Sequence, residues 1–152
     1  MRQSTAASVR EFVGLRTLAF VGLSRNPRQF ANAAYRDLRA KGYKLIPVNP
    51  HAESLEGDRC YPSLRALPEP VDGAILMVPP DAAEEVVVDA AAAGVRRVWV
   101  QQGAESAAVI QLCERFGITA VAGECILMFA EPAQFVHRLH RFGRRMCRTL
   151  PR

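Results

Sequence analysis

The stretch that decides the fold is LAFVGLSRNPRQFANAAYRDLRAKG, residues 18–42. It opens with a short apolar run, Leu18–Val21, which ends at Gly22. A polar loop follows, and the segment 29–41 then carries apolar residues at helical spacing until a glycine stops it. The residues that this helix is predicted to turn inward are Phe30, Ala34 and Leu38. A buried strand, a loop and an amphipathic helix in this order predict a strand–helix–strand unit.

The same succession recurs along the chain. Four more apolar runs follow, with starts 27, 29, 24 and 21 residues apart, which leaves room for a crossover each time. They are Leu45–Val48, Ala74–Val78, Val98–Val100 and Thr119–Ala122. Continuous rather than alternating runs are typical of strands buried on both faces of a parallel sheet. We therefore predict one doubly wound α/β domain with about five parallel strands, over residues 1–130.

Two further helices are predicted between these strands. The segment 81–93 begins with Asp81 and Glu84 at the spacing of a capping box. The segment 105–116 is expected to turn three residues inward: Val109, Ile110 and Cys113. The interval 50–70 is predicted to be a loop that contains one helical turn around Ser63 to Leu67.

Length and composition bound the class of protein. The 152 residues are 49% hydrophobic and 23% charged, which fits one globular domain with a packed core. No apolar run approaches the roughly 20 residues of a membrane span, and the N-terminus lacks the apolar stretch of a secretory signal. The four cysteines contain no CxxC pair and are expected to be thiols. We therefore expect a cytoplasmic protein and exclude secreted, disulfide-bonded, membrane-spanning and zinc-ribbon classes.

Basic charge is concentrated near the C-terminus. The net charge is +5, but residues 131–152 hold six arginines against one acid, and the rest of the chain is neutral. This segment predicts a basic amphipathic helix. Its apolar stripe is Phe135, Leu139, Phe142 and Met146. Two interpretations stay open: packing on the domain or on a second subunit, as in a homodimer, or a basic surface for nucleic acid or an anionic membrane. Since aromatic residues are not interleaved with the arginines, no specific nucleic-acid partner is expected.

The loop after the first strand carries the features of an anion site. Gly22 allows backbone to approach a ligand closely, and Ser24 offers a hydroxyl. The start of the next helix exposes unpaired N–H groups at the positive end of its dipole. Arg25 and Arg28 add guanidinium groups suited to phosphate or diphosphate. The alternative is a simple turn with solvated arginines, because one glycine falls short of the GxGxxG fingerprint.

Two observations disfavour an ordinary NAD site. The second and third glycines of the fingerprint are missing. NAD sites also usually carry an acid after the second strand to accept from ribose hydroxyls, and the residue there is Asn49. His51 nearby adds a donor. A site with no acid at this position would not repel a ribose phosphate, which points to a phosphorylated adenosine ligand other than NAD.

Four segments together resemble a known family. They are VGLSRNP (21–27), GYKLIPVNP (42–50), YPSLRALPEPVDGAILMVPP (61–80) and VWVQQGA (98–104). The ordered set is similar to the small stand-alone CoA-binding proteins, which share their fold with the CoA-binding domain of succinyl-CoA synthetase and related acyl-CoA ligases. The resemblance covers roughly residues 9 to 128. It implies a Rossmann-like fold that binds coenzyme A at the carboxyl edge of the sheet.

The resemblance also implies roles for individual residues. Those matching the segment that holds the CoA phosphates are Gly22, Ser24, Pro27 and Arg28. Those matching the edge that borders the adenosine are Val48, Asn49 and Pro50. The third-strand loop on the adenine and pantetheine side is matched by Val78, Pro79 and Pro80, and the loop after the fourth strand by Gln102 and Gly103.

The sequence departs from the stand-alone family at two places. Met77 and Val78 stand where the stand-alone family commonly has Phe-Arg. The Val-Pro-Pro of this chain, residues 78–80, is closer to the version of the motif in the ligases. This first departure removes a cation and shifts phosphate recognition onto Arg25 and Arg28. Near the end of the domain, an Asp-Arg-Cys of the family is replaced by Gly-Glu-Cys, residues 123–125.

No constellation for catalysis is evident. A synthetase-type ligase needs a phosphorylatable histidine in a further domain and a nucleotide-grasp domain, for which the chain has no room. The histidines and cysteines are interpreted as ordinary surface and core residues, with Cys125 near the place where a CoA thiol would arrive. We therefore expect a protein that binds CoA or an acyl-CoA without catalysis. The alternatives are an NAD(P)-type nucleotide-dependent enzyme, a subunit of a split acyl-CoA ligase, and an interaction protein that acts through its basic tail.

Overall fold

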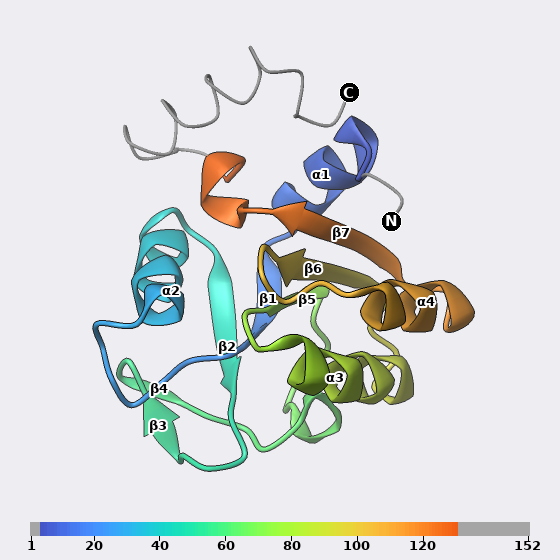
Figure 1. Ribbon diagram of the computed structural model, residues 1–152. Coiled ribbons are helices and arrows are strands. Elements are labelled where there is room, and N and C mark those ends of the chain that lie inside the picture. The colour runs from blue at the N-terminus through green and yellow to red at the C-terminus, as the bar shows by residue number, and fades with distance from the viewer. Residues whose placement is uncertain (1–3, 131–152) are drawn as a thin grey trace.

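A five-stranded parallel sheet forms the centre of the molecule. The computed structural model describes residues 4–130 and orders the strands β2-β1-β5-β6-β7 (Figure 1). Their bounds are β1 Thr17–Val21, β2 Lys44–Val48, β5 Gly73–Leu76, β6 Arg97–Gln101 and β7 Thr119–Glu124. All neighbours pair in parallel, and β1 lies between β2 and β5. The five predicted strands and the doubly wound Rossmann-like fold are thus confirmed.

Helices cover both faces of the sheet. They are α1 Ala6–Val13, α2 Phe30–Ala40, α3 Pro80–Ala92 and α4 Ala107–Arg115, with short 3-10 turns η1 Leu64–Ala66 and η2 Ile126–Met128. Side chains of α1, α2 and η2 pack with Phe20 and Trp99 on one face. Side chains of α3 and α4 pack with Val21 and Val98 on the other. Because alternate residues of one strand enter different clusters, each strand is apolar on both sides, as the continuous runs predict.

The interval predicted as loop contains a small hairpin. Its strands are β3 Ser54–Leu55 and β4 Asp58–Arg59, which pair in the antiparallel sense. The two-residue turn between them is Glu56–Gly57, and both residues have positive φ, 53° and 80°. Glycine suits such a turn, while glutamate at positive φ is uncommon and needs other contacts to hold it. The predicted helical turn near residue 64 is confirmed as η1.

Three local predictions are wrong. Phe30 does not face the core: it is the first residue of α2 and is 50% exposed, whereas the following turns bury Ala34 and Leu38. The capping box at the start of α3 does not form, because that helix begins at Pro80 with Pro79 as its N-cap and no side-chain cap bond. Ile110 is only partly buried. Helix α1, with Val9 and Phe12 buried, was not predicted.

The predicted C-terminal helix, residues 131–152, lies outside the described residues. Between residues 4 and 130, no helix combines the length and the apolar character needed to cross a bilayer.

Candidate functional site

A pocket opens where the strand order reverses. From β1 the chain crosses to β2 on one side and later returns to β5 on the other, so the loops at their carboxyl ends diverge. The pocket there has a volume of about 640 Å³, and we call it the central pocket. Seven of the predicted site residues line it: Gly22, Ser24, Val78, Pro79, Pro80, Gln102 and Gly103. The topology therefore gathers three of the four family-like segments at one place.

Gly22 is required by the close approach of the chain that follows β5. Its φ is 127°, and a Cβ built there would lie 2.1 Å from the carbonyl oxygen of Met77. The Met77 amide donates to the carbonyl of Val21 at 2.8 Å, which fixes the two backbones side by side. The chain after β5 thus makes a close approach at Gly22, while the predicted approach of a ligand at this residue stays a prediction.

Side chains hold the loop after Gly22 in one conformation. Ser24 Oγ accepts from the Asn26 amide, and Asn26 Oδ1 accepts from the Arg28 amide, both at 3.0 Å. Asn32, which is 1% exposed, clamps Ser24 from α2. Its Oδ1 accepts from the Ser24 amide at 3.0 Å, and its Nδ2 donates to the Ser24 carbonyl at 2.8 Å. The loop is thus preorganised by its own polar residues.

Asn32 was not predicted as a site residue. The signal that could have found it is a polar residue at the third position of an apolar-faced helix, where the helix meets the loop. An amide there has both a donor and an acceptor for backbone groups.

Two helices begin at the central pocket, and neither has a side-chain cap. The first turn of α2 lines the pocket with Gln29, Phe30 and Ala31, and α3 begins there with Pro80. Helices α1 and α4 begin elsewhere, and each is capped by a hydroxyl, of Thr5 and Ser106. Within residues 4–130 the amides of Phe30 and Ala31 have no acceptor. Both helix dipoles thus place partial positive charge at this pocket.

A second hollow lies beside β2 and the hairpin. We call it the hairpin pocket; its volume is about 800 Å³, and Asn49, Pro50, His51, Glu53, Arg59 and Cys60 are among its lining residues. The loop between β1 and α2, residues 22–29, is called the first loop. Asn49 connects the hairpin pocket to this loop, because Asn49 Nδ2 donates to the carbonyl of Leu23 at 3.1 Å. The guanidinium of Arg25 donates to the carbonyl of His51. Asn49 and Pro50 are therefore brought to the same edge of the sheet as the central pocket.

Four predicted residues line neither pocket. Val48 is buried inside the sheet. Pro27 and Arg28 are exposed, and the Pro27 carbonyl accepts from Arg36. Arg25 is engaged with His51, as described. The amide of Gly103 is occupied too, since it donates to Glu105 at 2.6 Å.

Comparison with known proteins identifies the family. A family model described as CoA binding domain matches residues 16–131. The chain belongs to this family. The match covers every strand and helix described above except α1, so the family and the fold coincide over the same residues.

Relatives of this CoA binding domain include a long ligase subunit and small proteins. The subunit alpha of an acetate–CoA ligase (ADP-forming) II from Pyrococcus furiosus is 24% identical over 126 residues, which cover 76% of this chain and 28% of that subunit. The chain therefore spans little more than a quarter of that relative's length.

Other similar proteins are small. A conserved hypothetical protein from Pyrococcus furiosus is 40% identical with a TM-score of 0.70, over 73% of this chain and 96% of that one. A hypothetical protein from Pyrococcus horikoshii OT3 is 29% identical with a TM-score of 0.80, over 88% of this chain and 96% of that one.

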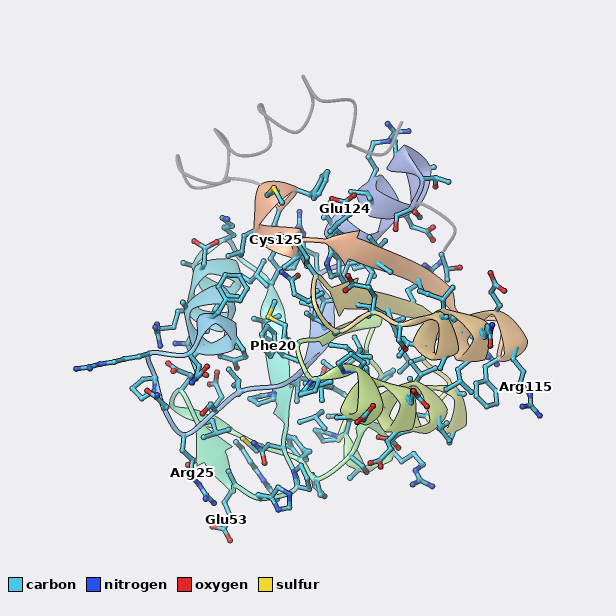
Figure 2. The ribbon with its side chains drawn as sticks, in the orientation of Figure 1. Phe20, Arg25, Glu53, Arg115, Glu124 and Cys125 are labelled. Atoms are coloured by element: carbon cyan, nitrogen blue, oxygen red, sulfur yellow. The ribbon has the colours of Figure 1, made fainter. Side chains whose placement is uncertain are left out.

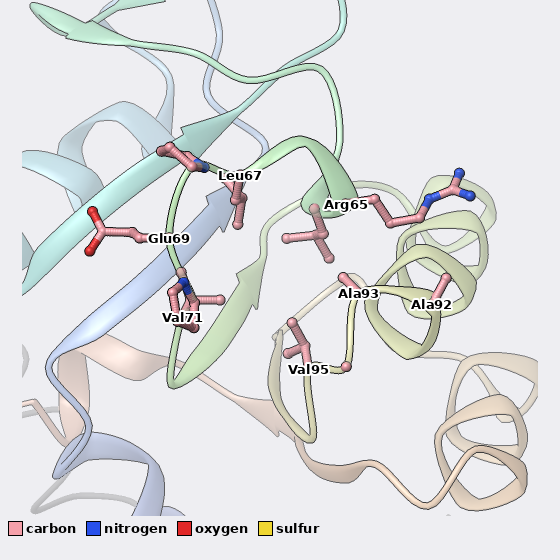
Figure 3. Close-up of a pocket in the computed structure, with 11 residues that line it drawn as sticks. Arg65, Leu67, Glu69, Val71, Ala92, Ala93 and Val95 are labelled. Atoms are coloured by element: carbon pink, nitrogen blue, oxygen red, sulfur yellow. The ribbon is translucent and has the colours of Figure 1, made fainter.

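A third hollow of about 510 Å³ lies at the opposite, amino-terminal edge of the sheet in this CoA binding domain. It is formed where chain segments lead into β5 and β6, with Leu67, Val71 and Val95 in its lining (Figure 3). Its two charged residues are neutralised, because Arg65 pairs with Asp89 and Glu69 pairs with Lys44. It lacks the open helix starts of the central pocket.

Three thiols lie buried in the described part of this CoA binding domain. Cys60, Cys113 and Cys125 are buried and unpaired with one another. Burial raises the pKa of Cys60 and raises that of Cys113 to about 11, since a thiolate is poorly solvated there. In the described part of the chain, no group of three or more His, Cys, Asp or Glu residues is arranged to hold a metal ion.

Glu56 couples the hairpin to the first loop and should make stability depend on pH. The hydrogen bond from Asn32 Nδ2, at 2.9 Å, is the main cause of a lowered pKa for this carboxyl, and the Arg36 guanidinium at 2.8 Å adds to it. A lowered folded-state pKa means that this stabilisation is present above the unfolded value, about 4.3, and is lost as the pH falls through the folded value.

Glu56→Gln should therefore destabilise the protein at pH 7 and lose much of that effect at acid pH. Urea unfolding of both proteins at pH 7 and pH 3.5 measures this difference. A gap between the two proteins that stays constant over this range would contradict the role of the ionised carboxylate.

Proposed function

We propose that this chain binds coenzyme A or an acyl-CoA and performs no chemistry of its own. In this proposal the loop 22–28 and the start of α2 hold the diphosphate. The adenosine lies between the ends of β2 and β5, bordered by Asn49 and Pro50. Family membership and the gathering of three family-like segments at the central pocket support this arrangement.

The observation that carries the proposal is the pair of uncapped helix starts at the central pocket. A diphosphate at this position would accept from the amides of Phe30 and Ala31 and lie at the positive ends of two dipoles. The preorganised Ser24 loop would not need to reorder on binding, which lowers the entropic cost of association. Val78, Pro79 and Pro80 offer an apolar wall for the adenine or pantetheine side.

We further propose that Arg28 pairs with the diphosphate from outside the pocket, with Arg25 as a second cation. The Arg28 side chain is exposed and has no acidic partner in residues 4–130. The guanidinium of Arg25 already lies at the boundary between the two pockets, at the carbonyl of His51. Both groups are long and flexible enough to turn toward an anion on the loop that carries them.

We propose the absence of catalysis because two cysteine thiols of the domain are protonated at neutral pH. Burial raises the pKa of the Cys60 and Cys113 thiols, which leaves little thiolate at neutral pH. The small proteins similar to this chain are covered almost completely by it, so they carry no further domain of substantial size.

Coenzyme A should raise the melting temperature of the full chain. At a free concentration of 100 times Kd, a ligand specific for the native state stabilises by about 2.7 kcal/mol, which shifts the Tm of a domain of this size by about 5–10 °C. Arg28→Glu should remove most of the shift, whereas the reversal Arg115→Glu at the far end of the molecule should leave it unchanged (Figure 2). No shift with millimolar CoA in the unsubstituted protein would overturn the proposal.

Three other functions make different predictions. A subunit of a split acyl-CoA ligase is favoured by the match to a ligase subunit alpha, and it predicts co-purification with a nucleotide-grasp subunit. An NAD(P)-dependent enzyme predicts a larger Tm shift with NADP than with CoA. An interaction protein that acts through its basic tail predicts that deletion of residues 131–152 abolishes function and leaves the domain folded.

A further inference from the structure

Arg59 is an exposed cation that contacts an aromatic ring and has no acidic partner within residues 4–130. It ends β4 and lines the hairpin pocket. Its guanidinium carbon lies 5.2 Å from the centroid of the Tyr61 ring, so the aromatic face orients the charged group. In the described part of the chain no carboxylate forms an ion pair with it.

The other arginines that contact this hairpin are neutralised. Arg36 pairs with Glu56, and Arg39 pairs with Asp58, each at 2.8 Å. These two acids belong to the turn and to β4, so they are directed to α2 and away from Arg59. The acid among the lining residues of the hairpin pocket is Glu53, which is exposed and projects outward from the molecule (Figure 2). The charge of Arg59 is therefore available to an external anion.

The ring under Arg59 is tied to the carboxyl end of β2. The Tyr61 amide donates to the Pro47 carbonyl at 3.0 Å, and the Asn49 amide donates to the Tyr61 carbonyl at 2.8 Å. These bonds extend the sheet by one parallel bridge, between Val48 and Tyr61. Arg59 thus has a rigid support one strand away from the first loop, at the same edge of the sheet.

We propose that Arg59 binds the phosphate monoester on the ribose of the nucleotide and so determines specificity for CoA over nucleotides without that group. This inference rests on the proposed function, because it needs the adenosine at the end of β2. A monoester is close to dianionic at neutral pH, and a planar guanidinium can bind two of its oxygens at once. The adjoining Asn49 amide carries no charge to repel it.

The test compares CoA with 3′-dephospho-CoA by isothermal titration calorimetry on the full chain. The unsubstituted protein should bind CoA at least about tenfold more tightly, as one charge-assisted pair implies. Arg59→Ala should weaken CoA binding about tenfold and leave dephospho-CoA binding unchanged, so that the two ligands become nearly equal. Arg59→Lys should keep part of the preference, since a point charge remains. Arg115→Ala is the matched control and should change neither affinity.

Each result separates the two proposals. Equal weakening of both ligands by Arg59→Ala, or no change in the preference for CoA, would overturn the role of Arg59 and leave CoA binding intact. If the unsubstituted protein binds neither ligand, the proposed function fails, and with it the inference. Circular dichroism of Arg59→Ala checks that the variant is folded.

Discussion

Gly22→Ala is expected to destabilise the protein by at least about 3 kcal/mol, a large share of the stability of an ordinary domain. Two costs add at this position. The backbone has φ 127°, which L-residues rarely adopt, and the new methyl group would lie 2.1 Å from the Met77 carbonyl oxygen. Relief of the clash requires separation of the backbones of Gly22 and Met77, and this would break the hydrogen bond from Met77 to Val21.

Urea unfolding at neutral pH measures this effect, and Gly94→Ala is the matched control. Gly94 also has positive φ, 77°, but nothing lies within 4 Å of a Cβ built there. It should cost only about 1–2 kcal/mol, the price of the backbone conformation alone. Equal effects of the two substitutions would show that contact with Met77 does not restrict residue 22.

Asn32→Asp is expected to destabilise the protein by about 3 kcal/mol at neutral pH and to weaken ligand binding at the first loop. Aspartate keeps the acceptor for the Ser24 amide but loses both donor bonds of the asparagine Nδ2, to the Ser24 carbonyl and to Glu56. It also places a second carboxylate within hydrogen-bond distance of Glu56 in a nearly buried site. Since like charges raise carboxyl pKa values, the destabilisation should shrink as the pH falls and one group takes up a proton.

The double variant Asn32→Asp with Glu56→Gln tests this explanation. The glutamine amide can donate to the new carboxylate, so the double variant should be more stable than Asn32→Asp alone at pH 7. Asn26→Ala, in the exposed part of the same loop, removes the bond to the Arg28 amide and should cost only about 1 kcal/mol. A double variant as unstable as the sum of its single changes would refute the repulsion between residues 32 and 56.

The sheet was predictable because each of its strands is a continuous apolar run. Runs such as Leu18–Val21 and Val98–Val100 are buried by helices on both faces, and that environment is recorded directly in the sequence. Parallel pairing and right-handed crossovers then bring the first loop to the same edge as the segments after β2 and β5. For this reason seven of the residues lining the central pocket could be named in advance.

Features that depend on a partner distant in sequence were not predictable in the same way. The hairpin β3–β4 is only two residues long in each strand, and Glu56 is held at positive φ by contacts with α2. Asn32 has no local pattern of its own, because its role is defined by the Ser24 backbone. Phe30 has the periodicity of a core residue but lies at the helix start, above the edge of the sheet, and so lines the pocket.

For the arginines, the sequence predicts position along the chain, whereas the surroundings of each side chain depend on distant segments. Sequence places Arg25 and Arg28 on the loop after β1, but the side-chain contacts that decide their surroundings come from other segments. Arg59 shares neither loop nor helix with them and is identified only through its contact with Tyr61 and its place in the hairpin pocket. Charge near a site is thus visible in the sequence, whereas its availability to a ligand depends on the fold.

A crystal structure of the full chain grown with excess CoA tests the proposed binding mode most directly. We expect the diphosphate within hydrogen-bond distance of the Phe30 and Ala31 amides, with the adenosine toward the end of β2 and the pantetheine along Val78–Pro80. CoA bound at the opposite edge, near Arg65 and Val95, or an empty central pocket at saturating CoA, would contradict it.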